Sequence, residues 1–337
     1  MNKKLPFIIT VLALSLAWSG CNKSGKLSQK SEFKPPTGPV EFKLKWPLGE
    51  RVEQDMDMKM KTETDVPGQP APIKQDITMG QSYGLTVLQA NADGTHEIEM
   101  DFLGARMSSQ MGGRTVMNYD SAKPAAADKA NPVGNIFGKI VGSKIRYFLD
   151  ASNAVERIEG VDDMMNRMAS GAQPQALAPL KSMFSEGYFK QLMSANLFLP
   201  SNPVQPGDSW PVQLEIPLSV LGTMIMNYNF TFKNWEMHGA RNCARLEFDG
   251  TIQTKPDSTP NATGFTMSIQ NGAVSGVSWF DPELGITIDT SINQNFSMIM
   301  QIPQNPRAKP KAGVAAKMQS ITNVMDQAMT IKLVSVK

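Results

Sequence analysis

Cysteine and histidine are scarce in this chain, and their scarcity limits the metal and redox chemistry open to it. The 337 residues include two cysteines, Cys21 and Cys243, and two histidines, His96 and His238. Neither histidine has a second histidine or a cysteine at the spacing of a zinc site, and no C-x-x-C redox motif is present. Cys243 stands at the start of a predicted strand and is expected to be a buried structural thiol.

The signature motifs of nucleotide binding and hydrolysis are also missing. The chain has no P-loop, no glycine fingerprint of a dinucleotide site and no G-x-S-x-G turn. No cofactor is therefore expected, and the protein is interpreted as a non-enzyme. Because the members of a Ser-His-Asp triad need not be adjacent in sequence, a hydrolase with a scattered site stays open as an alternative.

Neither charge nor hydrophobicity is concentrated in long blocks. The net charge is +2 and charged residues make up 19% of the chain, so no nucleic-acid partner is expected. The apolar run 5–17 has about 13 residues, whereas a membrane-spanning helix needs roughly 20. With Lys3 and Lys4 before it, this run is typical of a secretory signal peptide, assigned to residues 1–20.

The segment Ser19-Gly20-Cys21 resembles the bacterial lipobox, in which two small residues precede an invariant cysteine. The resemblance implies cleavage before Cys21 and a diacylglycerol thioether on its sulfur, which would bind the protein to a membrane. Trp18 departs from the pattern, because the lipobox usually has leucine at that position. Asn22 is not the aspartate that usually retains lipoproteins at an inner membrane, so the resemblance implies an outer-membrane anchor facing the periplasm. An ordinary signal peptide with an incidental cysteine is the alternative.

Residues 21–40 form a segment of distinct composition. Asn22 to Pro39 is rich in Lys, Ser, Pro and Gly and has almost no apolar residues. Such a segment cannot bury enough surface to offset the entropy lost on ordering. It is predicted to be a flexible tether between the lipid and a folded body.

Alternation of apolar and polar residues dominates the chain after the tether and predicts antiparallel strands with one buried and one solvated face. Val52, Met56, Met58 and Met60 share one face of the first strand. A turn at Ser152-Asn153 gives a predicted hairpin within residues 144–160. Further strands are predicted near residues 73–87, 98–102, 209–217, 224–237, 242–255, 264–281, 285–302 and 321–336.

The second half of the chain repeats the pattern of the first. Eleven positions separate Tyr83 from Gly94, and eleven separate Tyr228 from Gly239. We therefore expect a mainly β fold of two related antiparallel β-meander lobes, half-barrel or barrel-like, with a short helical insert between them. The lobes are assigned to residues 41–160 and 201–337, and helical spacing in 161–170 and 179–196 assigns a helical insert and linker to residues 161–200.

Methionine is abundant, with 23 residues. Met56, Met58 and Met60 form an M-x-M-x-M motif, and thioethers are soft ligands suited to Cu(I). These three residues are the candidate metal ligands of a second alternative, a Cu(I)-handling protein. Methionine is also a flexible core filler, and a concave sheet lined with it suits an acyl chain or another hydrophobic ligand.

Several longer motifs resemble those of a known but uncharacterised family. They are "WPLGERVEQDMDMKMKTET", "TMGQSYGLTVLQANADGTHEIEM" and "VSWFDPELG". The likeness is to bacterial β-rich secreted proteins and lipoproteins grouped as a domain of unknown function, the 6263 family, and it extends over residues 41–336. It implies no activity, cofactor or catalytic residue. The sequence thus predicts a lipid-anchored envelope protein with a non-catalytic binding or structural role, whose partner is an unknown protein or a hydrophobic ligand.

Overall fold

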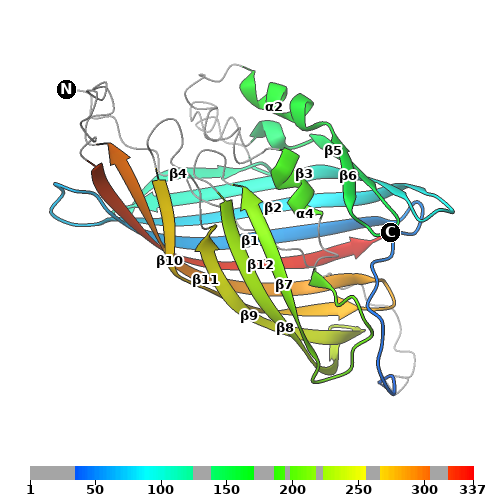
Figure 1. Ribbon diagram of the computed structural model, residues 1–337. Helices are drawn as coiled ribbons and strands as arrows, with labels where there is room; N and C mark the ends of the chain where they lie inside the picture. The colour runs from blue at the N-terminus through cyan, green and yellow to red at the C-terminus, as the bar shows by residue number, and fades with distance from the viewer. Residues whose placement is uncertain are drawn as a thin grey trace, which may run out of the picture.

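The described part of the chain forms one large antiparallel sheet with two helices beside it (Figure 1). The computed structural model describes residues 35–123, 138–170, 186–193, 198–217, 223–255, 266–303 and 318–337. Twelve strands belong to the sheet, and it does not close on itself. The expected mainly β fold of antiparallel meanders with a short helical insert is confirmed.

The strands follow the alternating segments of the sequence. The first half of the chain contains β1 (Arg51–Asp65), β2 (Ile73–Ala90), β3 (His96–Met111), β4 (Arg114–Asp120), β5 (Lys144–Leu149) and β6 (Val155–Glu159). The second half contains β7 (Ser209–Pro217), β8 (Thr223–His238), β9 (Arg241–Thr254), β10 (Thr266–Asp281), β11 (Ile286–Pro303) and β12 (Met318–Val336). Strand β4 was not predicted, although Gly112 and Gly113 before it both have positive φ, as a tight hairpin turn requires.

Strand β1 shows why these segments form a two-faced sheet. Every second side chain, from Val52 to Thr64, is buried, whereas Lys59 and Lys61 between them are exposed. Successive side chains of a strand point to opposite faces. The apolar face therefore turns inward, toward the hollow of the curved sheet, and the charged face turns to solvent.

The two meanders are halves of a single sheet. The strand order is β6-β5-β3-β2-β1-β12-β11-β10-β9-β8-β7, with β4 paired to β3. Strand β1 pairs with β12 along almost its whole length, from Val52 opposite Val336 to Asp65 opposite Thr322. The sheet is thus a continuous meander in space. The helical insert connects its two edge strands, β6 and β7, whereas the first and last strands, β1 and β12, pair in its middle.

Helices α2 (Val161–Ala169) and α4 (Glu186–Leu192) lie in the predicted insert. Helix α2 contacts β5, whereas α4 contacts β6 and β7, the two edges of the sheet. The buried Phe189 of α4 packs edge-on against Phe102 of β3, with ring centroids 6.4 Å apart. The open side of the half-barrel is therefore narrow enough for one helix to touch both of its edges. Neither described helix has the length and hydrophobicity to cross a membrane.

Residues 40–46, named here the N-terminal strap, run across one end of the half-barrel. Val40 exchanges two backbone hydrogen bonds with Val204, just before β7. At the other end of the strap, the Trp46 indole Nε1 donates to Asn153 Oδ1 at 2.9 Å, in the turn between β5 and β6. The strap therefore ties together connections from both halves of the sheet.

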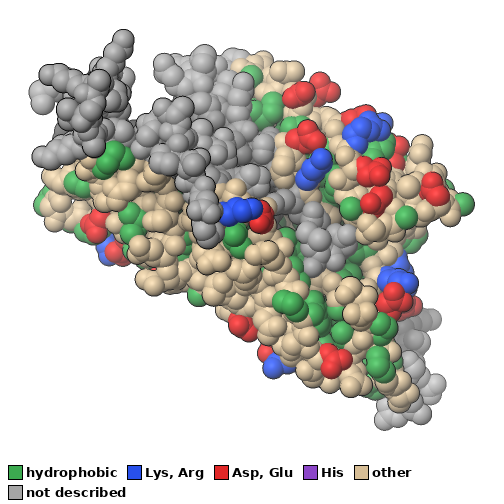
Figure 2. All heavy atoms as spheres, in the orientation of Figure 1, with side chains coloured by type: hydrophobic (Ala, Val, Ile, Leu, Met, Phe, Trp, Pro, Cys, Tyr) green, Lys and Arg blue, Asp and Glu red, His purple; other side chains and the backbone are tan. Residues whose placement is uncertain are grey.

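Acidic and basic side chains are interspersed over the face shown in Figure 2. This distribution agrees with the small net charge of the whole chain, +2.

Candidate functional site

A row of four methionines crosses the inner face of the sheet. Met329, Met58, Met79 and Met107 occupy directly paired positions on β12, β1, β2 and β3. Met58, Met79 and Met329 are buried, and Met107 is partly buried against the core. Directly paired residues have Cβ atoms about 4.5–5.5 Å apart. These four residues, the methionine row, therefore make a continuous strip of flexible thioether side chains.

The predicted metal ligands belong to this inner face. Met56, Met58 and Met60 are at most 1% exposed and lie within the hydrophobic core cluster. Packing in the core therefore accounts for the burial of these three methionines. Binding of Cu(I) by their thioethers stays an untested prediction. Among the same residues, no group of three or more His, Cys, Asp or Glu side chains is arranged to hold a metal ion.

An enclosed aromatic cavity lies on the inner face of the second half. It has a volume of about 40 Å³ and is lined by Tyr228, Phe230 and Phe248, together with Leu44 and Leu199. The rings of Phe230 and Phe248 pack with centroids 4.9 Å apart. Burial raises the pKa of the Tyr228 hydroxyl well above its ordinary value, so this group stays neutral. The cavity is thus uncharged and has room for about one water molecule.

An open groove of about 1010 Å³ lies next to this cavity, at the end of the half-barrel that the strap crosses. Trp46, His96 and Trp210 line the groove, and so do Leu44 and Leu199. These two leucines also line the enclosed cavity, so they lie between the cavity and the groove, and we name them the leucine wall.

The cavity adjoins the methionine row through β11. Ile292 lines the cavity and lies directly opposite Met329 of β12. Groove, leucine wall, aromatic cavity and methionine row therefore follow one another along the inner face.

Five buried polar side chains lie beside the methionine row. This polar cluster consists of Thr62, Thr64, Gln294, Asn323 and Gln327. Gln294 lies directly opposite Gln327, and Thr64 lies directly opposite Asn323. All five are at most 4% exposed, and each has at least one buried side-chain oxygen or nitrogen without a hydrogen-bond partner. Each such atom costs about 1–3 kcal/mol of stability, so the cluster calls for an explanation.

Gln54 is a further buried polar residue without side-chain hydrogen bonds, and it lies on the opposite side of the methionine row from the polar cluster. Its side chain is 1% exposed, and neither its oxygen nor its nitrogen has a partner. Sequence reasoning missed Gln54 and the polar cluster because it recorded only the apolar members of each strand face. A polar residue at an inward position of a strand could have revealed these residues. Gln54, for example, stands at the inward position between Val52 and Met56.

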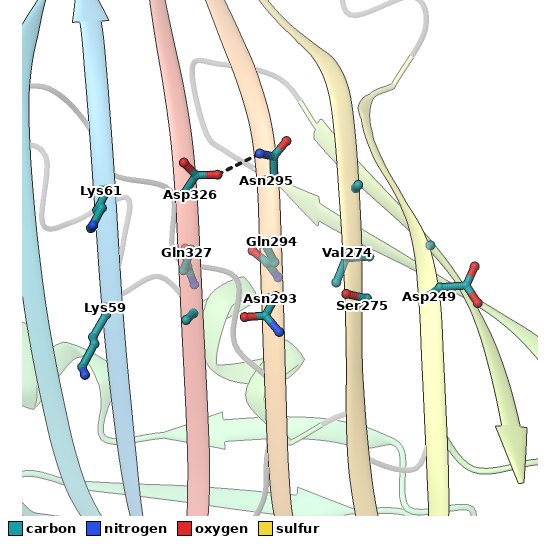
Figure 3. Close-up of a pocket in the computed structure, with 13 residues that line it drawn as sticks. Lys59, Lys61, Asp249, Val274, Ser275, Asn293, Gln294, Asn295, Asp326 and Gln327 are labelled. Atoms are coloured by element: carbon teal, nitrogen blue, oxygen red, sulfur yellow. Dashed lines mark hydrogen bonds between the residues drawn. The ribbon is translucent and has the colours of Figure 1, made fainter. Parts of the chain in front are cut away.

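A second groove, of about 650 Å³, lies on the outer face of β1, β12, β11, β10 and β9 (Figure 3). Lys59 and Lys61 stand on one side of it and Asp249 on the other (Figure 3). Between them, Asn295 Nδ2 donates to Asp326 Oδ1 at 2.8 Å. This groove offers exposed polar groups, and its two carboxylates, Asp249 and Asp326, are exposed, so it provides no apolar enclosure for a ligand.

The two histidines lie in different surroundings. His238 Nε2 is 3.1 Å from Asp289 Oδ2, and its ring stacks on Trp279 with centroids 4.1 Å apart. His96 lines the groove at the strap, and burial lowers its pKa. Within the described ranges, no hydrogen bond joins either histidine to a serine hydroxyl. The hydrolase alternative therefore stays a prediction without a nucleophile–base pair to support it.

A family model matches residues 93–287. The chain belongs to the family of unknown function DUF6263. This membership confirms the family expected from the sequence motifs, and DUF6263 has no activity assigned to it. No curated protein matches the chain.

Three solved structures are similar to the DUF6263 chain at low sequence identity. A lipovitellin structure, solved for its lipid–protein interactions, is 8% identical with a TM-score of 0.42; the match covers 87% of this chain and 26% of lipovitellin. This chain therefore spans about a quarter of the lipovitellin chain that it matches. A Bacteroides fragilis protein described as exported, with a YmcC-like fold, is 12% identical with a TM-score of 0.28, over 88% of this chain and all of the other.

The third structure is a Parabacteroides distasonis protein described as a lipoprotein. It is 10% identical with a TM-score of 0.27, and the match covers 89% of this chain and 100% of the other. At these TM-scores the three likenesses establish neither the fold nor the ligand of the DUF6263 chain.

Proposed function

We propose that this DUF6263 protein is a lipid-anchored protein of the cell envelope that binds a hydrophobic ligand on the inner face of its half-barrel, without catalysing a reaction. The observation that carries the proposal is the continuous apolar path on that face. It runs from the open groove, past Leu44 and Leu199, through the aromatic cavity to the methionine row.

The composition of the path suits an adaptable apolar ligand. Thioether side chains are flexible and polarisable, so a methionine surface can repack around ligands of different shape. Ligand pockets usually measure about 300–1,000 Å³, and the enclosed cavity measures about 40 Å³. Binding an acyl chain therefore requires Leu44 and Leu199 to move aside, which joins the cavity to the groove.

The anchor supports the same role. Cys21 lies outside the described residues, so its lipidation rests on the lipobox alone. The tether would join the strap at Val40, beside the open groove. A flexible chain of about 19 residues has an end-to-end distance of roughly 25 Å. An outer-membrane anchor on Cys21 would therefore keep the groove within reach of a bilayer, facing the periplasm.

The probe N-phenyl-1-naphthylamine, which fluoresces when it leaves water, tests ligand binding. The full chain carrying Cys21→Ser is used, because a lipidated protein needs detergent and detergent competes for the probe. We expect saturable binding that is several-fold tighter in Leu199→Ala, which opens the wall between groove and cavity. Met58→Gln should weaken binding several-fold, because it places an amide in the methionine row.

Lys59→Gln is the matched control, since Lys59 is the next residue and faces solvent on the outer side. It should leave probe binding unchanged. Absence of saturable binding in every variant would contradict the proposal, and so would equal losses in Met58→Gln and Lys59→Gln. Circular dichroism melts identify variants that fail to fold. Because a partly unfolded protein also binds hydrophobic probes, the gain in Leu199→Ala counts only when the variant melts cooperatively and its binding saturates at one probe per protein.

A further inference from the structure

The polar cluster is placed to meet a ligand that lies along the methionine row. Gln327 is two residues before Met329 on β12 and occupies the neighbouring inward position. The two positions are about 7 Å apart along the strand. Gln327 lies between Met60 of β1 and Gln294 of β11. A hydrocarbon chain on the methionine row would therefore place a polar group at its end among the two glutamine amides.

The polar cluster contains no charged side chain. The buried carboxylates of the described residues form ion pairs in other parts of the molecule. These are Glu99, Asp281 and Asp289, and each has a basic partner: Glu99 pairs with Lys144 and Arg146, Asp281 with Arg241, and Asp289 with His238. None of them belongs to the polar cluster, and no buried lysine or arginine is found in the described ranges. A carboxylate or phosphate entering the cluster would have no opposite charge to offset its desolvation. An uncharged group with hydrogen-bonding atoms has no such penalty.

The free atoms of the cluster match the needs of an ester or amide. Gln327 and Asn323 each have both side-chain atoms without partners, which gives NH donors and carbonyl acceptors. Thr62 and Thr64 add hydroxyl groups that can donate or accept. A carbonyl oxygen of the ligand can thus receive hydrogen bonds that the protein itself leaves unmade.

We propose that the polar cluster receives the uncharged ester or amide group of an amphiphile whose hydrocarbon chain lies along the methionine row. This proposal rests on the proposed function, because it names the class of ligand that the inner face takes. It assigns the donor role to Gln327, whose amide nitrogen is free and which is the member of the cluster nearest to Met329. The free Oε1 of Gln294 can accept only from the N–H of an amide ligand.

Displacement of N-phenyl-1-naphthylamine by three ligands of similar length tests the proposal. They are methyl laurate, which has an ester, laurate, which has a charge, and tridecane, which has neither. Methyl laurate should compete best, by about tenfold over tridecane for one or two buried hydrogen bonds. Laurate should be weaker than methyl laurate at pH 8.

The variants Gln327→Met and Gln294→Met keep the size of the side chain and remove the amide. Gln327→Met should lower the affinity for methyl laurate about tenfold, leave tridecane unchanged, and raise the melting temperature of the ligand-free protein. Gln294→Met should raise the melting temperature but leave the affinity for methyl laurate unchanged, because the free atom of Gln294 is the acceptor Oε1 and an ester has no donor. Asn293→Leu, on the outer face beside Gln294, is the matched control and should change neither affinity.

The outcomes separate this proposal from the proposed function. Probe binding without preference for methyl laurate over tridecane overturns the ester or amide assignment and leaves hydrophobic binding intact. Tighter binding of laurate overturns the uncharged assignment. Methyl laurate affinity that is unchanged in Gln327→Met overturns the proposal, because the free amide of Gln327 then makes no hydrogen bond to the ester. Complete absence of probe binding overturns both.

Discussion

Arg51 on β1 reaches across β2 and donates two hydrogen bonds to the carboxylate of Asp101 on β3. The Nη1–Oδ1 distance is 2.8 Å and the Nη2–Oδ2 distance is 3.0 Å. The hydrogen bonds to Asp101 are the main reason that the pKa of Arg51 is raised above its ordinary value. The guanidinium passes over Gly84 of β2, where a Cβ atom would collide with it. Glycine is therefore favoured at this strand position by a neighbouring side chain, not by a turn.

The same arrangement recurs four residues along β2. Arg106 of β3 is hydrogen-bonded to Asp57 of β1, and Gly80 of β2 lies beneath its side chain. Two arginines thus cross β2 in opposite directions and clamp three strands of the first half together on the outer face.

Gly84→Ala should lower the free energy of unfolding by about 1 kcal/mol, because the added methyl displaces the Arg51 guanidinium from Asp101. Urea unfolding followed by circular dichroism measures the change. Gly104→Ala on β3 is the matched control, since its added Cβ would meet neighbouring atoms at an ordinary 3.6 Å. In an Arg51→Gln background the Gly84→Ala penalty should shrink; an equal penalty in both backgrounds would show that the arginine is not the cause.

His96 should make the protein less stable in mild acid. Burial lowers its folded-state pKa below the ordinary 6.5. As the pH falls below 6.5, the unfolded chain takes up a proton at this site before the folded protein does. Stability is therefore lost as the pH falls from 6.5 through the folded pKa. Urea midpoints at pH 7.5 and 5.5 should differ less in His96→Gln than in the wild type, and an unchanged difference would exclude His96 as the source.

The thiol of Cys243 should be unreactive in the folded protein. Its side chain is fully buried, and burial, helped by the nearby Asp281 carboxylate, raises its pKa to about 12. The thiolate is the reactive form, so Ellman's reagent at pH 8 should react with Cys243 only after guanidinium unfolding. Rapid reaction of the native protein would contradict the burial of Cys243.

Replacing Cys21 by serine should release the protein from the membrane. If the cysteine carries a diacylglycerol, Cys21→Ser should move the protein from the membrane pellet to the soluble envelope fraction. Cys243→Ser is the control, because it removes the other thiol and should leave the protein in the pellet. A Cys21→Ser variant that still pellets would mean that another part of the chain holds it at the membrane.

Most strands could be predicted because alternation depends only on neighbouring residues in the sequence. The segment 224–237, for example, was predicted as a strand and forms β8, Thr223–His238. The pairing of β1 with β12 could not be predicted, since alternation tells which face a side chain occupies but not which strand lies beside it. The merging of the two meanders into one sheet depends on that pairing.

The candidate site was predictable only in part, for the same reason. Met56, Met58 and Met60 were assigned correctly to one strand face. Their continuation through Met79 and Met329 depends on the register with β2 and β12, which no local pattern encodes. The division into separate lobes and the lipidation of Cys21 remain predictions.

The central position of β12 has a consequence for how the protein is made. Until residues 318–336 have been synthesised, β1 and β11 are both unpaired edges, and unpaired edges attract other chains. The inward face of β1 is more apolar than its outward face. The incomplete protein therefore exposes methionine side chains and unpaired backbone N–H and C=O groups on the same strand. Joining the two halves requires contacts between residues more than 250 positions apart, and such distant contacts make folding slow. We therefore expect the incomplete sheet to be prone to pairing with other chains until its last strand arrives.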